Sequence, residues 1–164
     1  MGTEISKEQL PVGVWTQDIE KYPGPYEFVA PCGYKCKISR NTYLCWCGYV
    51  KLPETHIFNN LDYDRRSRHG SRGYDNVNQY VIVHGDLTFA NGNTFGFDCA
   101  HSFTDIIPGD AILGDTFINI IPETGRKYWT YDDVKRETED LASQFKQYEK
   151  YNSIEELQND KENN

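Results

Sequence analysis

The feature that most constrains the fold is a long amphipathic segment in the last third of the chain. Apolar side chains there recur at steps of four and three residues, the spacing of one face of an α-helix. Thr130 precedes this segment, and Asp133 lies three positions after Thr130. This spacing is a variant of the capping box that begins helices. We therefore predict a helix over residues 131–150 that buries one face against another layer. The side chains on that face are Val134, Thr138, Leu141, Phe145 and Tyr148.

The segments before this helix alternate apolar and polar side chains, a pattern typical of β-strands. Residues 34–38 and 43–50 alternate around the turn Ser39–Thr42. Residues 81–101 hold a second pair of such segments around Asn91-Gly92. A run of strands followed by one long helix favours an α+β fold. We predict an antiparallel sheet of hairpins with the long C-terminal helix packed on one face.

The composition indicates a folded domain with an acidic surface. Of the 164 residues, 38% are hydrophobic and 14% aromatic, which is too apolar for a disordered chain. We predict a single domain over residues 1–152 and a frayed, acidic, Asn-rich tail over residues 153–164. The net charge of -8 argues against nucleic acid as a partner and against anionic membranes. With no apolar run of the roughly 18 residues that span a membrane, we expect an intracellular, cytoplasmic protein.

Four of the five cysteines surround the first predicted turn. Pairing across this turn places Cys36 opposite Cys45, and Cys36, Cys45 and Cys47 then share one face of the strands. Together with Cys32 these thiols could bind zinc, although their spacing differs from the C-x2-C pairs typical of zinc sites. We favour the simpler interpretation, that they are small buried side chains in a reduced protein.

The loop length of the second hairpin decides which side chains share a face. A two-residue loop, Asn91-Gly92, mixes polar and apolar side chains on both faces. A three-residue loop that adds Asn93 places Phe89 opposite Phe95 and separates the two kinds of side chain. Because each large apolar side chain on the wrong face would lose about 1.5–3 kcal/mol, we predict the three-residue loop. The apolar face would then hold Val83, Leu87, Phe89, Phe95, Phe97 and Cys99.

The opposite face of this hairpin is the candidate functional site. Asp86 and Asp98 would face each other, which is unfavourable unless a cation, a proton or His84 lies between them. His101 and Asp105 follow the second strand, and their spacing of four brings them together if the chain turns helically there. The candidate ligand-binding residues are His84, Thr88, Asp98 and His101. The candidate ligands for a divalent metal such as zinc or manganese are His84, Asp98, His101 and Asp105.

Two other features are weaker candidates. A polar loop contains four closely spaced arginines, whose guanidinium groups match the geometry of phosphate oxygens. The alternative is a solvated loop whose charge is balanced by neighbouring aspartates. His56 also follows a loop, and we interpret it as incidental. The candidate phosphate contacts are Arg65, Arg66, Arg68 and Arg72.

Three strings of the sequence, "CGYVKLPETH", "VHGDLTF" and "FGFDCAH", resemble a family of small proteins found mainly in phage and bacterial genomes. The family pattern runs CGYV, HGGLT, GFD-x-AH and then a C-terminal helix, and the match covers Cys47 to His101 plus the helix. The chain departs from it at Asp86, where the pattern has glycine, which shifts weight to His84, Asp98 and His101. The resemblance implies no particular chemistry. Phage context implies an accessory role, such as interfering with a host defence.

These observations leave three hypotheses about function. The first is a small accessory protein that binds a compact polar or phosphorylated ligand on the polar face of the 81–101 hairpin. The second is a metal-assisted hydrolase in which His84, Asp98 and His101 bind the ion and Asp105 or Asp86 acts as the base. The third is a protein–protein interaction module. The sequence contains no Walker loop, dinucleotide-binding glycine motif or Gly-x-Ser-x-Gly elbow, which disfavours those enzyme classes.

Overall fold

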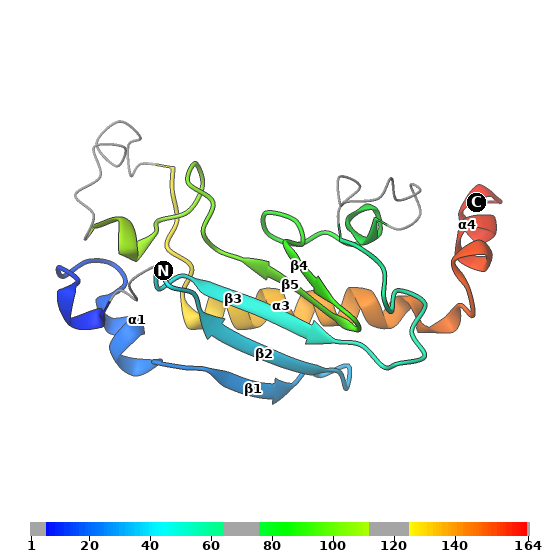
Figure 1. Cartoon of the computed structure of the whole chain (residues 1–164), viewed down its shortest axis with the longest axis horizontal. Coiled ribbons are helices and arrows are strands. Elements are labelled where there is room, and N and C mark those ends of the chain that lie inside the picture. Colours follow the sequence, from blue (N-terminus) through cyan, green and yellow to red (C-terminus); the bar gives the residue numbers. More distant parts are fainter. Residues whose placement is uncertain (1–5, 64–75, 112–124, 164) are drawn as a thin grey trace.

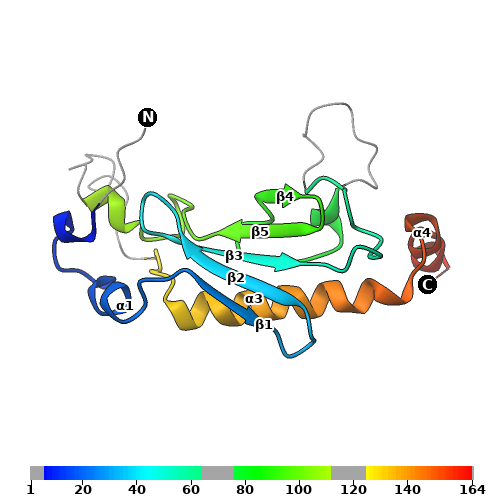
Figure 2. The ribbon, with the colours of Figure 1, turned by 60° about the horizontal axis from the view of Figure 1, so that its bottom comes forward.

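One antiparallel sheet organises the computed structural model, which describes residues 6–63, 76–111 and 125–163. Within these residues the sheet has five strands in the order β1-β2-β3-β5-β4, and helix α3 runs along one of its faces (Figures 1 and 2). The predicted α+β fold is therefore confirmed. The strands are β1 (Tyr26–Val29), β2 (Lys35–Arg40), β3 (Trp46–Lys51), β4 (Phe89–Asn91) and β5 (Thr94–Asp98).

Helix α3 (Tyr131–Lys146) begins as its capping sequence predicts. The Thr130 hydroxyl accepts a hydrogen bond from the Asp133 backbone N–H at 3.2 Å, and the Asp133 carboxylate accepts one from the Thr130 N–H at 3.1 Å. Helix α3 ends at Lys146, four residues before the predicted end at residue 150, and a 3-10 helix over Gln147–Lys150 follows it. Its predicted apolar face lies on the sheet, and the buried side chains are Val134, Thr138, Leu141, Ala142 and Phe145.

A glycine on the central strand lets α3 approach the sheet closely. A Cβ at Gly48 would overlap the hydroxyl of Thr138 on the helix and the ring of Phe97 on β5. Phe97 and its neighbour Phe95 are fully buried in the layer between sheet and helix, where Phe95 packs against the ring of Phe145. Burial of each such ring stabilises the fold by about 1.5–3 kcal/mol. The core therefore lies on one face of the sheet.

The shorter helices lie around this two-layer core. Helix α4 (Ile154–Glu162) lies in the segment that we expect to fray: the Ser153 hydroxyl caps it by accepting from the Glu156 N–H at 3.1 Å, and Leu157 is only 1% exposed. Leu157 and the half-buried Ile154 pack against the core, and the other residues of this helix are polar. In the described part of the chain, no helix is both long enough and apolar enough to cross a membrane. The shorter helices around the core are η1 (Lys7–Gln9), α1 (Thr16–Lys21), η3 (Val77–Gln79), η4 (Pro108–Ala111), η5 (Gln147–Lys150) and α4 (Ile154–Glu162).

The β2–β3 hairpin has a longer loop than the sequence predicts. Residues 41–45 form it, and the Asn41 carboxamide oxygen accepts hydrogen bonds from the backbone of Tyr43 at 2.9 Å and of Cys45 at 3.0 Å. Cys36 therefore pairs with Val50 rather than with Cys45. The predicted register is wrong because the Asn41 side chain organises a wider turn than the short one that pattern alone suggested.

The β4–β5 hairpin has a two-residue loop, Gly92-Asn93, so the predicted three-residue loop is wrong. Asn91 pairs with Thr94 and Phe89 pairs with Gly96, a register one step away from the predicted one. Gly92 has φ of 60°, and a positive φ at the first loop position is what such a tight hairpin requires. Phe89 consequently lies on the face away from α3 and is 39% exposed. Residues 81–88 are loop rather than strand, so the predicted polar face of a long hairpin does not form.

A candidate metal site at the end of the sheet

The candidate site residues do come together, but beyond the end of β5 rather than on a hairpin face. His84 lies in the loop before β4, Asp98 is the last residue of β5, and His101 and Asp105 follow it. The ring centroids of His84 and His101 are 5.3 Å apart. One potential ligand atom from each of His84, His101 and Asp105 lies within 4.8 Å of the others. Three of the four predicted metal ligands therefore form one cluster.

A single helical turn brings His101 and Asp105 together, as their spacing of four predicts. The Asp105 N–H donates to the His101 carbonyl at 2.8 Å, and the His101 N–H donates to the Asp105 carboxylate at 2.9 Å. A β-bridge between Asp105 and Lys127 holds this turn against the segment that leads into α3. The two reciprocal hydrogen bonds fix the carboxylate beneath the imidazole rings.

Asp105 is a fully buried carboxylate at the base of the cluster. Nε2–H of His84 lies 2.9 Å from both of its oxygens, and the Thr104 hydroxyl donates at 3.2 Å. Burial by itself raises the pKa of Asp105, but the hydrogen bonds from His84 and from the His101 backbone outweigh it and leave the pKa below its ordinary value. Asp105 therefore carries a negative charge that the surrounding donors stabilise.

Helix α3 and the segment before it position His84. The His84 backbone N–H donates to the Glu137 carboxylate at 2.8 Å, and its ring packs against the indole of Trp129 with centroids 4.2 Å apart. These contacts hold the imidazole between Trp129 and His101. Sequence reasoning missed both supporting residues, because each is more than forty positions from His84 and no local pattern marks them.

Thr88 and Asp98 support His101 rather than extend the cluster. The Thr88 hydroxyl donates to the Asp98 carboxylate at 2.8 Å, and the Ala100 N–H donates to it at 3.0 Å. Nε2–H of His101 donates to the Asp98 carbonyl at 3.0 Å and lies 3.5 Å from its carboxylate. The Asp98 carboxylate thus has partners of its own, and it is not one of the clustered ligands.

The loop before β4 contains a sharp turn at Gly85 and Asp86. Both residues have positive φ, 67° and 65° respectively. A Cβ at Gly85 would overlap the His101 ring, so glycine allows the loop to pass over that imidazole. Asp86 is exposed in this turn and does not pair with Asp98, so the predicted opposition of these two carboxylates is wrong.

The cluster opens into a surface pocket of about 620 Å³. Both imidazoles line this pocket, while Asp105 lies below them. The exposed Phe103 ring forms part of the wall, and two hydroxyl groups provide the other polar side chains. A ligand in this pocket would therefore meet the histidines directly. The lining residues are His84, Gly85, Ala100, His101, Ser102, Phe103 and Thr104.

Two imidazoles and one carboxylate form a donor set that suits zinc, manganese or iron. Nitrogen and oxygen donors from three protein residues leave further coordination positions for water or for a ligand. Residues next to the cluster already orient its members, as metal sites require: Thr104 bonds to Asp105, and Glu137 holds the backbone of His84. The residues present therefore fit a divalent ion with open positions toward the pocket.

The cysteines do not form a second site. Cys36 lies on the core side of the sheet and Cys47 on the other, so the predicted shared face is wrong. Burial raises the pKa of Cys36 to about 12 and that of Cys47 to about 11, which disfavours the thiolate that binds metal. Within the described residues, the His84, His101 and Asp105 group is the only set of three potential ligands close enough for one ion.

His56 and the arginine loop stand apart from the cluster. His56 is buried, and its Nδ1 accepts from the Phe58 N–H at 3.1 Å while Nε2–H donates to the Phe145 carbonyl at 2.8 Å. Burial lowers the pKa of His56, so the neutral ring serves as a structural link to the end of α3. The arginines at 65, 66, 68 and 72 lie outside the described residues.

Comparison of the chain with protein-family models, curated proteins and solved structures finds no match. The resemblance to phage and bacterial proteins stays a prediction. The strings that carry it are neighbours in the fold, because Cys47 on β3 pairs with Asp98 on β5 and His101 follows directly. Cys47, His84, Asp98 and His101 of that pattern thus lie at the end of the sheet that holds the cluster.

Proposed function

We propose that the protein binds a divalent metal ion through His84, His101 and Asp105, and that the ion holds a compact polar or phosphorylated ligand in the adjoining pocket. The observation that carries this proposal is the cluster itself: one ligand atom from each of these residues within 4.8 Å, beside a pocket of about 620 Å³. Zinc and manganese are the ions that this donor set favours.

The charge arrangement supports an ion rather than a purely structural cluster. A buried carboxylate needs a positive charge or several donors close to it. His84 meets that need with an exchangeable proton, which a divalent ion can replace. The second imidazole, His101, lies close enough to complete the ligand set. Metal binding would then release protons and weaken as the pH falls, because histidine must be neutral to donate its electron pair.

The pocket supports a polar ligand. Three protein ligands leave positions that phosphate, carboxylate or hydroxyl oxygens can occupy. The hydroxyls of Ser102 and Thr104 line the same pocket and can donate to such oxygens. In this arrangement Thr88 and Asp98 act by holding His101, and the direct contacts to the ligand come from the ion and the pocket wall. Phage context would make this an accessory protein.

Metal titration tests the proposal. Purified protein stripped with a chelator should bind one equivalent of Co²⁺ or Zn²⁺, measured by visible absorption of bound Co²⁺ and by elemental analysis. His84→Ala and His101→Ala should lower the affinity at least about 100-fold, whereas Asp86→Asn, an exposed carboxylate in the same loop, should leave it unchanged. Circular dichroism checks that each variant folds. Binding that is equally strong in both histidine variants would refute the site.

Metal-assisted hydrolysis is the second candidate function, favoured by the open positions of a three-ligand site. A bound zinc ion lowers the pKa of its water to about 7 and supplies hydroxide at neutral pH. Asp105 would be a ligand here, so Asp86 is the remaining predicted base, and it does not line the pocket. The expected result is metal-dependent hydrolysis of p-nitrophenyl phosphate that His84→Ala abolishes. Metal binding without turnover would exclude hydrolysis and leave ligand binding as the proposed function.

A further inference from the structure

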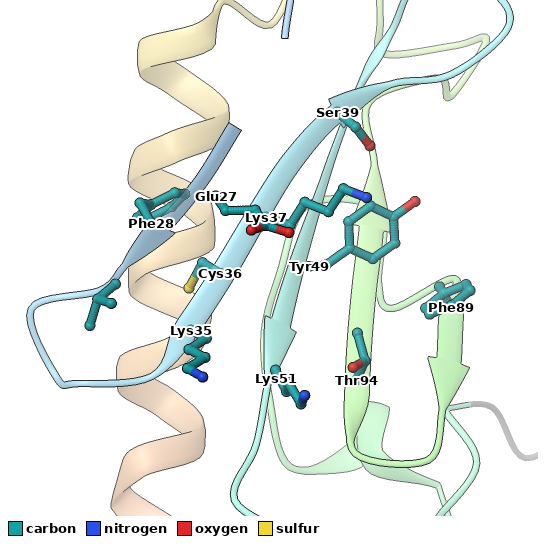
Figure 3. Close-up of a pocket in the computed structure, with 11 residues that line it drawn as sticks. Glu27, Phe28, Lys35, Cys36, Lys37, Ser39, Tyr49, Lys51, Phe89 and Thr94 are labelled. Atoms are coloured by element: carbon teal, nitrogen blue, oxygen red, sulfur yellow. The ribbon is translucent and has the colours of Figure 1, made fainter. Parts of the chain in front are cut away.

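The face of the sheet opposite α3 carries an ordered row of side chains. Lys37 on β2 pairs with Tyr49 on β3, Tyr49 pairs with Gly96 on β5, and Gly96 pairs with Phe89 on β4. Paired residues of antiparallel strands project to the same side of a sheet. Lys37, Tyr49 and Phe89 therefore form one row across four strands (Figure 3).

The ring of Tyr49 forms a flat platform on this face, and the ring of Phe89 stands beside it at an angle of 86°. A Cβ at Gly96 would lie only 2.5 Å from Cδ1 of Tyr49, so the absence of a side chain lets the tyrosine ring lie across the sheet. The rings of Tyr49 and Phe89 meet edge to face, with centroids 5.2 Å apart. Phe89 is 39% exposed, so part of its ring is accessible to a ligand. Aromatic surface of this kind stacks well on a flat ligand ring.

Three lysines lie beside this platform. Lys35 and Lys51 face each other directly in the next row, and Lys37 belongs to the aromatic row. Two like charges opposite each other are unfavourable unless an anion lies between them. In the part of the chain that the structure describes, none of these three ammonium groups has an ion-pair partner. Glu27 on β1 pairs with Lys37, so the face carries three positive charges and one negative charge here, in a protein with a net charge of -8.

The lysines and the platform surround a groove of about 810 Å³, which Figure 3 shows from above the sheet. Its volume lies within the range of roughly 300–1,000 Å³ that is typical of small-ligand sites. Glu27 is the one acidic side chain in its lining. Hydroxyl groups at Ser39, Tyr49 and Thr94 add hydrogen-bonding positions. The groove therefore combines a flat apolar surface with excess positive charge.

We infer that this groove binds a mononucleotide, whose base stacks on the Tyr49 platform with its edge against Phe89, while its phosphates bind between Lys35, Lys37 and Lys51. Charge complementarity selects an anion, and the platform selects one that carries a flat ring. The overall negative charge of the protein opposes a long polyanion far more than a ligand with a few charges, which favours a nucleotide over a nucleic acid strand. This site shares no residue with the metal cluster.

Isothermal titration in metal-free buffer tests this inference with ATP, AMP, adenosine and inorganic phosphate as probes. ATP should bind at one site, more tightly than AMP, and both should bind more tightly than adenosine or phosphate alone. Replacing all three groove lysines by glutamine should weaken ATP binding about 10- to 100-fold. The matched control, Lys7→Gln, Lys150→Gln and Lys161→Gln, removes the same charge from exposed positions elsewhere and should have no effect.

Phe89→Ala tests the aromatic contact beside the Tyr49 platform separately, because this ring is exposed on an edge strand and its loss should not unfold the protein. It should weaken ATP and adenosine binding and leave the weak binding of phosphate unchanged. His84→Ala should bind ATP as the wild type does, whether or not this variant still binds a metal ion. Absence of ATP binding by folded wild-type protein overturns the inference. An equal loss of ATP binding in the control triple variant, or a loss of ATP binding in His84→Ala, would also overturn it. Tighter binding of a single-stranded oligonucleotide than of ATP would do the same.

Discussion

Asp18 and Asp105 are two buried carboxylates whose partners give them different roles. The Asp18 carboxylate accepts from the Arg40 guanidinium at 2.9 Å, from the Trp46 indole at 2.9 Å and from the Tyr128 hydroxyl at 2.6 Å. Burial raises the pKa of Asp18, but the hydrogen bonds from Tyr128, from the Tyr131 backbone N–H, from Trp46 and from Arg40 together lower it below its ordinary value. The donors of Asp105 are instead a histidine, a hydroxyl and a backbone N–H.

The difference lies in what the donors can release. Arginine keeps its proton at any accessible pH, and neither tryptophan nor a protonated tyrosine is a metal ligand. The donors around Asp18 therefore offer no ligand atom to a metal ion. Their hydrogen bonds join α1 to β2, β3 and the segment before α3. Histidine can release its proton and offer a nitrogen to a metal ion. Asp105 also lies beneath an open pocket. A buried carboxylate is thus a structural link in one place and, in our proposal, part of a metal site in the other.

The largest expected effect is on stability, from Asp18→Asn. The change leaves the Arg40 charge buried without its counter-charge, and removal of one partner from a buried ion pair costs about 3–5 kcal/mol. Urea unfolding should measure this loss, with the exposed Asp132→Asn as the control. The folded fraction should still bind Co²⁺. If the folded Asp18→Asn protein failed to bind the metal, Asp18 would contribute to metal binding, and the two carboxylates would not have different roles.

The next effect is stabilisation by metal. A ligand that binds only the folded state at about 100 times its Kd adds about 2.7 kcal/mol to the free energy of unfolding. Zn²⁺ or Mn²⁺ should therefore raise the Tm of the wild type and of Asp18→Asn by similar amounts. It should not raise the Tm of Asp105→Asn. An equal rise in all three proteins would place the ion elsewhere.

Asp105→Asn should cost less stability than Asp18→Asn, about 1–2 kcal/mol, because no permanently charged guanidinium loses its counter-charge there. The asparagine oxygen can still accept a hydrogen bond from the imidazole. Metal affinity should fall much more than stability does. Thermal unfolding without metal, compared directly with Asp18→Asn, measures the difference. Equal losses would mean that the hydrogen bonds of Asp105 contribute as much to stability as the ion pair between Asp18 and Arg40.

The smallest effect concerns acid. Both carboxylates have a folded-state pKa below the ordinary value, so their ionisation stabilises the folded protein fully above about pH 4. That stability is lost as the pH falls through the folded-state pKa values. Each Asn variant should therefore show a shallower decline of the free energy of unfolding below pH 4 than the wild type. An unchanged slope in either variant would show that its carboxylate does not gain from folding.

The helix and the turn after β5 follow from neighbouring residues, so the sequence predicts them well. Thr130 and Asp133 cap α3 as expected, and the four-residue spacing of His101 and Asp105 forms the expected turn. Both depend on hydrogen bonds between residues three or four positions apart. The registers of the two hairpins were predicted wrongly, because a single side chain or one positive φ changes them: Asn41 widens one loop and Gly92 tightens the other.

By itself, the sequence determined the fold class, the position of the long helix and the identity of most residues in the candidate site. Those properties rest on periodicity and local spacing. Only the tertiary structure decided how His84 meets Asp105, because Trp129 and Glu137 hold that loop from distant positions. It also decided that Asp98 supports the cluster instead of joining it, and that Tyr49 and Phe89 share a face. Contacts between residues far apart in the chain depend on strand register and helix packing, which local patterns do not specify.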